Sequence, residues 1–225
     1  MDALLLESIL GAAALGIYSA AYRVAQAAHA LAPPIFRVAA PFFARARAVS
    51  LRSTAALTHD RLRSLGLMFG LLSAGMALSG PPILLRVYGP AFAASTMPLI
   101  ALSAATLPLT VNGLFTIIAL ATNLETQMLR VNIINGAISL ALNLILIPGM
   151  GPTGSALALL LAAVAGLGQG GELLRREGML SFREGAAAIA PAAEESAGPK
   201  LKALIVDGQN NHNWKGTTPV MQKYL

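Results

Sequence analysis

A chain of 225 residues with 12% charged and 56% hydrophobic residues cannot cover a water-soluble globule, since soluble domains carry about 25% charged residues. It has no cysteine, which excludes disulfides, thiolate metal sites and cysteine nucleophiles. A net charge of +6 is also found in nucleic-acid-binding proteins, but most arginines here lie in short segments between apolar stretches, as in membrane proteins. We therefore expect membrane lipids as the solvent, with no nucleic-acid partner, metal or cofactor.

The uncharged stretches predict an all-α fold, a polytopic transmembrane helix bundle of about five spans after a partial helix at Met1–Leu10. That first segment is expected to be the tail of a helix whose beginning is missing, or an interfacial lead-in. The five spans are expected at Ile9–Leu31, continuing toward Phe43 with a kink at Pro33-Pro34, at Leu65–Leu85, at Ala94–Thr122, and twice within Val131–Gly171.

The run Val131–Gly171 is too long for one crossing, because about 20 residues span the hydrocarbon core. Its middle, Pro148–Pro152, is dense in proline and glycine and predicts a turn. We expect a helical hairpin with a very short loop.

The arginines predict which ends of the spans face the cytoplasm. The loop expected between the first two spans carries a single acid, Asp60, and the arginines Arg45, Arg47, Arg52, Arg61 and Arg63. Loops of this kind are cytoplasmic. Alternation then places Arg86 and the Pro148–Pro152 turn outside, and Glu125, Arg130, Arg175, Arg176 and Arg183 inside.

The composition changes after Gly171, so we expect three parts: a transmembrane lobe at residues 1–171, a charged segment and linker at 172–199, and a soluble tail at 200–225. Glu172–Glu184 is predicted to be an interfacial helix, and Gly185–Pro199 a flexible linker. All four lysines lie in the tail and all twelve arginines precede it, which suggests two sequences of different origin. The tail predicts a strand, a polar loop and the start of a helix.

The candidate site residues in the membrane part begin with a polar stripe on the first span. At about 100° per residue, the stripe falls within a sector of about 140°. It comprises Tyr18, Ser19, Tyr22, Arg23, Gln26 and His29. A charge at membrane depth must face a cavity or a partner. Arg23 is either the cation of a water-filled path for an anionic lipid diphosphate, beside Tyr18 and Tyr22, or a structural arginine paired with a carboxylate. His29 is expected to be a packed interface residue.

Asparagines near the third and fourth spans, Asn112, Asn132, Asn135 and Asn143, can line a path or bond across helices, and we favour helix–helix bonding. Asn112 and Asn143 are kept as substrate-path candidates. The membrane part shows no catalytic constellation and no metal-ligand spacing, so we do not expect an enzyme there. In the tail, His212 follows a predicted strand and is either a site residue or part of an ordinary polar loop.

Several segments of residues 1–171 resemble polysaccharide-export flippases of the multidrug, oligosaccharidyl-lipid and polysaccharide exporter superfamily. They are Leu15–Arg23, Tyr88–Phe92, Asn143–Pro148, Gly151–Ala156 and, near the start, Asp2. The resemblance implies a lobe of an alternating-access transporter on the inner (cytoplasmic) membrane, with a lipid-linked glycan as substrate. The family has two such lobes around a central cavity. This sequence carries only the second, so we expect it not to transport alone and to need an N-terminal lobe as partner.

The tail resembles the start of the trehalose-utilisation family, whose fold is similar to class I glutamine amidotransferases. The matching residues are Lys202–Gly208, His212, Trp214 and Thr217–Pro219. Two alternatives to the transporter therefore remain open: a truncated, membrane-tethered, sugar-active α/β enzyme, or a non-functional fusion of two neighbouring genes.

Overall fold

The computed structural model describes residues 2–180, and this part of the chain is built from helices without a strand. The predicted all-α fold is confirmed there. The chain divides into two units, Met1–Ile189 and Ala190–Leu225, and the described residues all belong to the first. The predicted tail with His212, the linker and residues 181–184 of the predicted interfacial helix lie outside the described residues.

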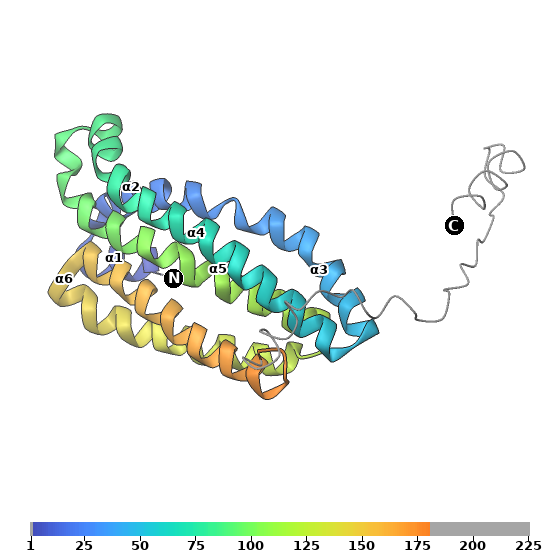
Figure 1. The fold of residues 1–225 in the computed structure, drawn as a ribbon. Coiled ribbons are helices and arrows are strands. Elements are labelled where there is room, and N and C mark those ends of the chain that lie inside the picture. The colour runs from blue at the N-terminus through green and yellow to red at the C-terminus, as the bar shows by residue number, and fades with distance from the viewer. Residues whose placement is uncertain (1, 181–225) are drawn as a thin grey trace, which may run out of the picture. The chain divides into compact units, whose positions relative to one another are not determined.

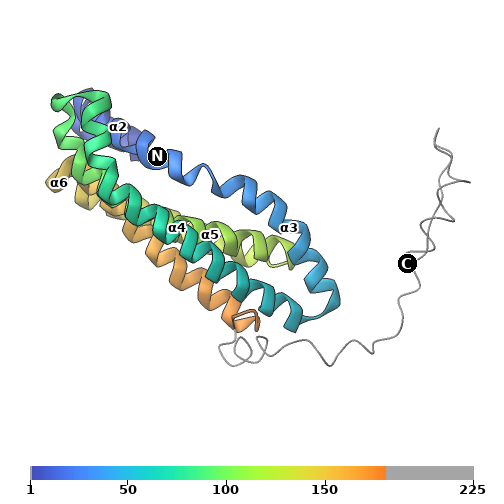
Figure 2. The same cartoon turned by 45° about the horizontal axis from the view of Figure 1, so that its top comes forward.

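The helices follow one another with short connections (Figure 1). In chain order they are α1 (Asp2–Leu10), α2 (Ala12–His29), α3 (Ala32–Val49), α4 (Leu51–Tyr88), the 3₁₀ helix η1 (Pro90–Ser95), α5 (Thr96–Ala121) and α6 (Glu125–Arg176). Helix α5 is central and packs against α2, α3, α4 and α6. In Figures 1 and 2 the α2–α3 segment lies along one side of α4 and α5, and α6 lies along the other.

Helix α6 is a hairpin of two arms that reverses at Gly151, with backbone angles φ 58° and ψ −136°. A left-handed φ of this kind favours glycine, which has no Cβ to clash. The arms pack closely after the reversal, because a Cβ on Gly154 would overlap the Leu146 carbonyl. The predicted hairpin is confirmed, and its turn needs no loop between the arms.

The first predicted span is divided more finely than expected. Gly11, with φ 80°, separates α1 from α2, so Ile9 and Leu10 belong to the preceding helix. A second break falls at Ala30 and Leu31, two residues before the expected kink, and α3 begins with proline in its first turn. Proline is favoured in the first turn of a helix, where its missing N–H leaves no hydrogen bond unmade.

The prediction of an arginine-rich loop between the first two spans is wrong. Helix α3 continues to Val49 and α4 begins at Leu51, so only Ser50 separates them. The Ser50 hydroxyl accepts a hydrogen bond from the Ser53 backbone N–H at 3.0 Å and caps α4. The uncharged stretch marks where a helix meets lipid, and it does not mark where the helix ends. For the same reason, α6 continues through Glu172 to Arg176, and no separate helix begins at Glu172.

Among residues 2–180, three helical segments are long and apolar enough to cross a membrane: Leu51–Tyr88, Pro90–Ala121 and Glu125–Arg176. The first expected span, Ile9–Leu31, is not among them. The chain is accordingly described as a membrane protein. The alternation predicted from the arginines fits the helix order, because the α3–α4 turn lies at the same end of the bundle as the end of α6. Gly178, just after α6, lies close to Leu51 at the start of α4, because a Cβ on Gly178 would be 3.1 Å from Leu51 Cδ2. We call this end the arginine end, and the opposite end, with Gly11, η1 and Gly151, the turn end.

A separate apolar core serves each end of the bundle. The core of the arginine end includes Phe43, Leu65, Leu124 and Met179. The core of the turn end joins Leu6 of α1, Leu84 of α4, Leu99 of α5 and Ile147 of α6. The second core holds α1 and α2 against the α6 hairpin and so positions the polar face of α2.

Candidate functional site

A pocket of about 250 Å³ opens where α2 meets α1, α5 and α6. One carboxylate, one imidazole, one amide and two hydroxyl-bearing side chains enter it among aliphatic walls. The lining residues are Asp2, Tyr22, Ala25, Gln26, His29, Leu102, Thr106, Leu109 and Leu159. A concave site with apolar walls and a few convergent polar groups is the usual form of a ligand site.

The predicted polar stripe of α2 divides between the pocket, the protein interior and the surface. Tyr22 and Gln26 line the pocket together with His29. Tyr18 is buried and stacks on Tyr22, with ring centroids 5.9 Å apart and planes at 23°. Arg23 is exposed and has no ion-pair partner among residues 2–180. The structure therefore does not bear out a carboxylate partner for Arg23 within this part of the chain.

A buried polar cluster lies beside the pocket and joins α1 to both arms of α6. Asn143 is fully buried, and its Nδ2 donates to the Ser139 carbonyl at 2.9 Å and to Asp2 Oδ1 at 3.4 Å. The Ser155 hydroxyl donates to Asn143 Oδ1 at 3.0 Å. The Tyr18 hydroxyl is buried beside Ser155 of this cluster. The cluster orients Asp2 at the pocket wall, so Asn143 reaches the pocket only through that carboxylate.

Asn112 lies outside the pocket and connects two helices. Its Nδ2 donates to the Ala163 carbonyl at 2.8 Å, from α5 to the second arm of α6. The amides of Asn112 and Asn135 both approach Gly166, where a Cβ would come within 2.7 Å of Asn112 Nδ2. Asn112 and Asn143 thus make the cross-helix bonds that the sequence favoured, while Asn132 is exposed.

Three polar residues of the pocket are not among the substrate-path candidates that the sequence indicates. Asp2 was noted only through its family resemblance, His29 was expected to pack at an interface, and Thr106 carried no signal. His29 is half-buried, and its Nδ1 has no hydrogen-bond partner in the described part of the chain. The position of His29 on the stripe with Gln26 was the available signal, since residues three apart share a helix face.

The pocket presents an aromatic ring beside hydrogen-bonding groups. Within residues 2–180 no group of three His, Cys, Asp or Glu side chains could hold a metal ion. Tyr22, backed by Tyr18, presents an aromatic surface, and Gln26 and Thr106 offer hydrogen-bonding groups. No family model, curated protein or solved structure matches this chain.

Proposed function

We propose that residues 2–171 form one lobe of a flippase that moves polysaccharide or lipid-linked oligosaccharide across the inner (cytoplasmic) membrane. The pocket on the polar face of α2, in a bundle with three segments apolar enough to cross a membrane, carries this proposal. A transporter needs such a polar surface at membrane depth, because a sugar and its phosphates cannot cross lipid unaided.

Each polar group on α2 has a role in this proposal. The exposed face of Tyr22, which is 40% exposed, stacks against a sugar ring, and Tyr18 holds the Tyr22 ring in place from behind. Gln26 and His29 bond to sugar hydroxyls further along the helix. Arg23, next to Tyr22 and without an ion pair among residues 2–180, binds the lipid diphosphate.

Arg23 also favours a partner on the α2 side of the bundle. An arginine that faces lipid is costly, at about 3 kcal/mol near the bilayer centre. We propose that a second lobe, packed over α2, covers this charge and completes the central path. Transport is then expected only with that lobe present. The enzyme alternative depends on residues 200–225, and no observation in residues 2–180 favours it.

A binding experiment tests the proposal. The full chain is purified in detergent and titrated with a lipid diphosphate carrying a fluorescent disaccharide, and the Kd is measured. Tyr22→Ala and Arg23→Gln should each weaken binding by about tenfold, because each removes a contact worth about 1.4 kcal/mol. Leu78→Ala is the control, since Leu78 is 81% exposed on α4 and is not among the pocket residues. Unchanged binding by both α2 variants would show that α2 does not recognise the glycan.

A further inference from the structure

A second pocket, of about 360 Å³, lies between α3 and α4 toward the arginine end, and it shares no residue with the α2 pocket. Its walls are apolar except for one arginine. It is lined by Pro34, Ile35, Val38, Ala39, Phe42, Arg61 and Leu65. We call this pocket the α3–α4 groove.

The apolar wall of the groove is open to the surroundings of the protein. Val38 is 65% exposed and Phe42 is 51% exposed, both on α3. The opposite wall belongs to α4, one of the helices apolar enough to cross a membrane. The open apolar surface of α3 therefore lies beside a helix that can cross a membrane, where lipid chains are the surroundings, so an acyl chain is the occupant that the surroundings supply.

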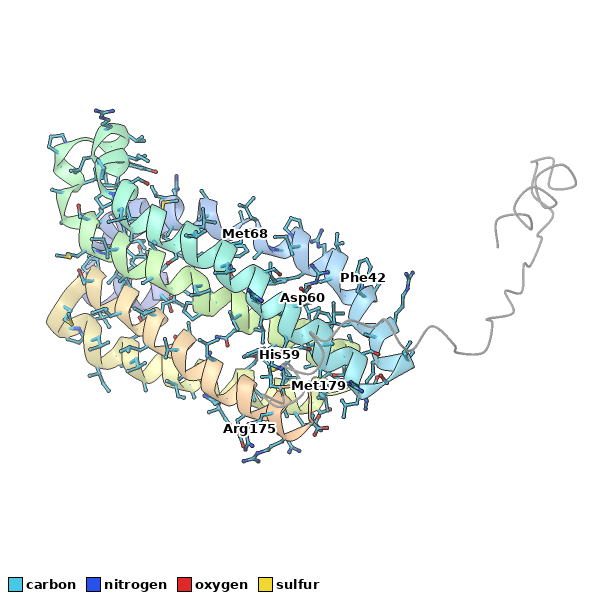
Figure 3. The ribbon with its side chains drawn as sticks, viewed as in Figure 1. Phe42, His59, Asp60, Met68, Arg175 and Met179 are labelled. Carbon is cyan, nitrogen blue, oxygen red and sulfur yellow. The ribbon has the colours of Figure 1, made fainter. Side chains whose placement is uncertain are left out.

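Positive charge gathers where the groove meets the arginine end. Arg61 lines the groove from α4. Arg45 lies three residues beyond Phe42 on α3, hence on the same helix face, and it is exposed with no ion pair among residues 2–180. The nearby acid is Asp60, whose Oδ2 is 3.6 Å from Arg61 Nε in a solvent-exposed contact. Figure 3 shows Phe42 and Asp60 toward this end of the bundle.

We propose that the α3–α4 groove binds an anionic phospholipid from the leaflet at the arginine end. One acyl chain lies along Val38, Phe42 and Leu65, and the phosphate meets Arg61 and Arg45. The pattern of an apolar groove ending in cations matches a lipid with an anionic headgroup, whereas a zwitterionic headgroup would bring its own cation close to the arginines. Basic residues at a membrane surface attract anionic lipid in this way.

The groove has a physical consequence for the fold. Helices α3 and α4 pack against each other through Ala39, Phe43, Leu65 and Phe69 in the core of the arginine end, and the groove lies beside this contact. A lipid seated there covers the open side of this contact and brings a negative charge to Arg61. Phosphatidylglycerol should therefore bind and should raise the thermal stability of the protein more than phosphatidylcholine does.

The test is native mass spectrometry of the full chain in detergent, with phosphatidylglycerol or phosphatidylcholine added. Phosphatidylglycerol should bind more tightly, and Arg45→Gln and Arg61→Gln should each reduce that preference by about fivefold. Asp60→Asn, which removes the competing carboxylate, should increase it. Arg86→Gln at the turn end is the matched control and should leave it unchanged. Val38→Trp, which fills the groove, should reduce binding of both lipids without lowering the helix content.

Three results would overturn the proposal. The first is an unchanged preference in the Arg45→Gln/Arg61→Gln double variant. The second is normal lipid binding by a folded Val38→Trp variant, which would mean that the groove holds something other than an acyl chain, such as a partner helix. The third is equal displacement of the lipid by glycerol phosphate, which would mean that the site recognises a free phosphate.

Discussion

At the turn end α6 reverses at Gly151 and α4 joins α5 through Gly89 and η1, whereas at the arginine end α3 and α4, separated by Ser50 alone, continue as helix past the apolar stretches. Gly151 and η1 close the first end, and a buried cluster around Asn143 holds α1 and α6 together there. At the other end, exposed arginines lie on the last turns of α3 and the first turns of α4. The comparison indicates that one end is built for precise packing and the other for contact with charged surroundings.

The first prediction concerns which side of the membrane each end of the bundle faces. Cysteine labelling from one side is expected to be all or none. The chain has no cysteine, so each introduced cysteine is a unique label site. Positions at the arginine end should react with a membrane-impermeant maleimide from the cytoplasmic side only, and positions at the turn end from the other side only. The substitutions are Ala48→Cys and Glu177→Cys for the arginine end, and Ala93→Cys and Met150→Cys for the turn end.

Labelling is measured in vesicles of known orientation. All four positions are exposed in the protein, so a cysteine that fails to react is separated from the reagent by the membrane and is not buried. Reaction of both pairs from the same side would contradict the alternating arrangement and would remove the basis for separating the two ends.

The second prediction concerns the close packing of the α6 hairpin. Gly154→Val should destabilise the protein by about 2–3 kcal/mol, because a side chain there meets the Leu146 backbone, which cannot move aside. Gly168→Ala is the matched control on the same arm, where a Cβ meets nothing within 4 Å. Reversible unfolding in mixed micelles, followed by circular dichroism, gives both values. Equal stability of the two variants would show that the arms are not in contact.

How far the sequence predicts the structure differs between the two ends. The reversal at Gly151 was predictable because proline and glycine act locally. The helices around Ser50 were not, since charged residues end a membrane crossing without ending a helix. In the pocket, a helical wheel placed Tyr22 and Gln26 on one face. It could not show that Asp2, far away in sequence, would lie opposite them, because that depends on how α1 packs against α6.

The third prediction concerns the buried cluster. Asn143→Leu should cost about 1–2 kcal/mol, because the Ser155 hydroxyl loses its acceptor and the Asp2 carboxylate loses a donor. Asn132→Leu is the control, since Asn132 is exposed on the same arm of α6. The same unfolding assay measures both. If Asn143→Leu destabilises the protein no more than Asn132→Leu does, the cluster contributes nothing to the stability of the turn end.

The last and smallest prediction concerns pH at the arginine end. Glu172, which follows the uncharged run of α6, accepts hydrogen bonds from Arg175 at 2.6 and 2.8 Å and from Arg176 at 2.8 Å. These bonds, with the two positive charges, lower the pKa of Glu172 from 4.5 to about 2. A carboxyl whose pKa is lower in the folded state binds protons more weakly than in the unfolded state. Its stabilisation is therefore present above pH 4.5 and is lost as the pH falls toward 2.

Comparing Glu172→Gln with the unsubstituted chain isolates this contribution. The gap between their melting temperatures should be small, because exposed ion pairs contribute little, and it should close as the pH is lowered from 6 to about 2. Glu177→Gln is the matched control, since Glu177 is exposed and has no ion pair among residues 2–180. A gap for Glu172→Gln that stays constant over this range would mean that the arginines do not hold the carboxylate. The end of α6 would then owe its stability to Leu174 and Met179, which are buried in the core of the arginine end.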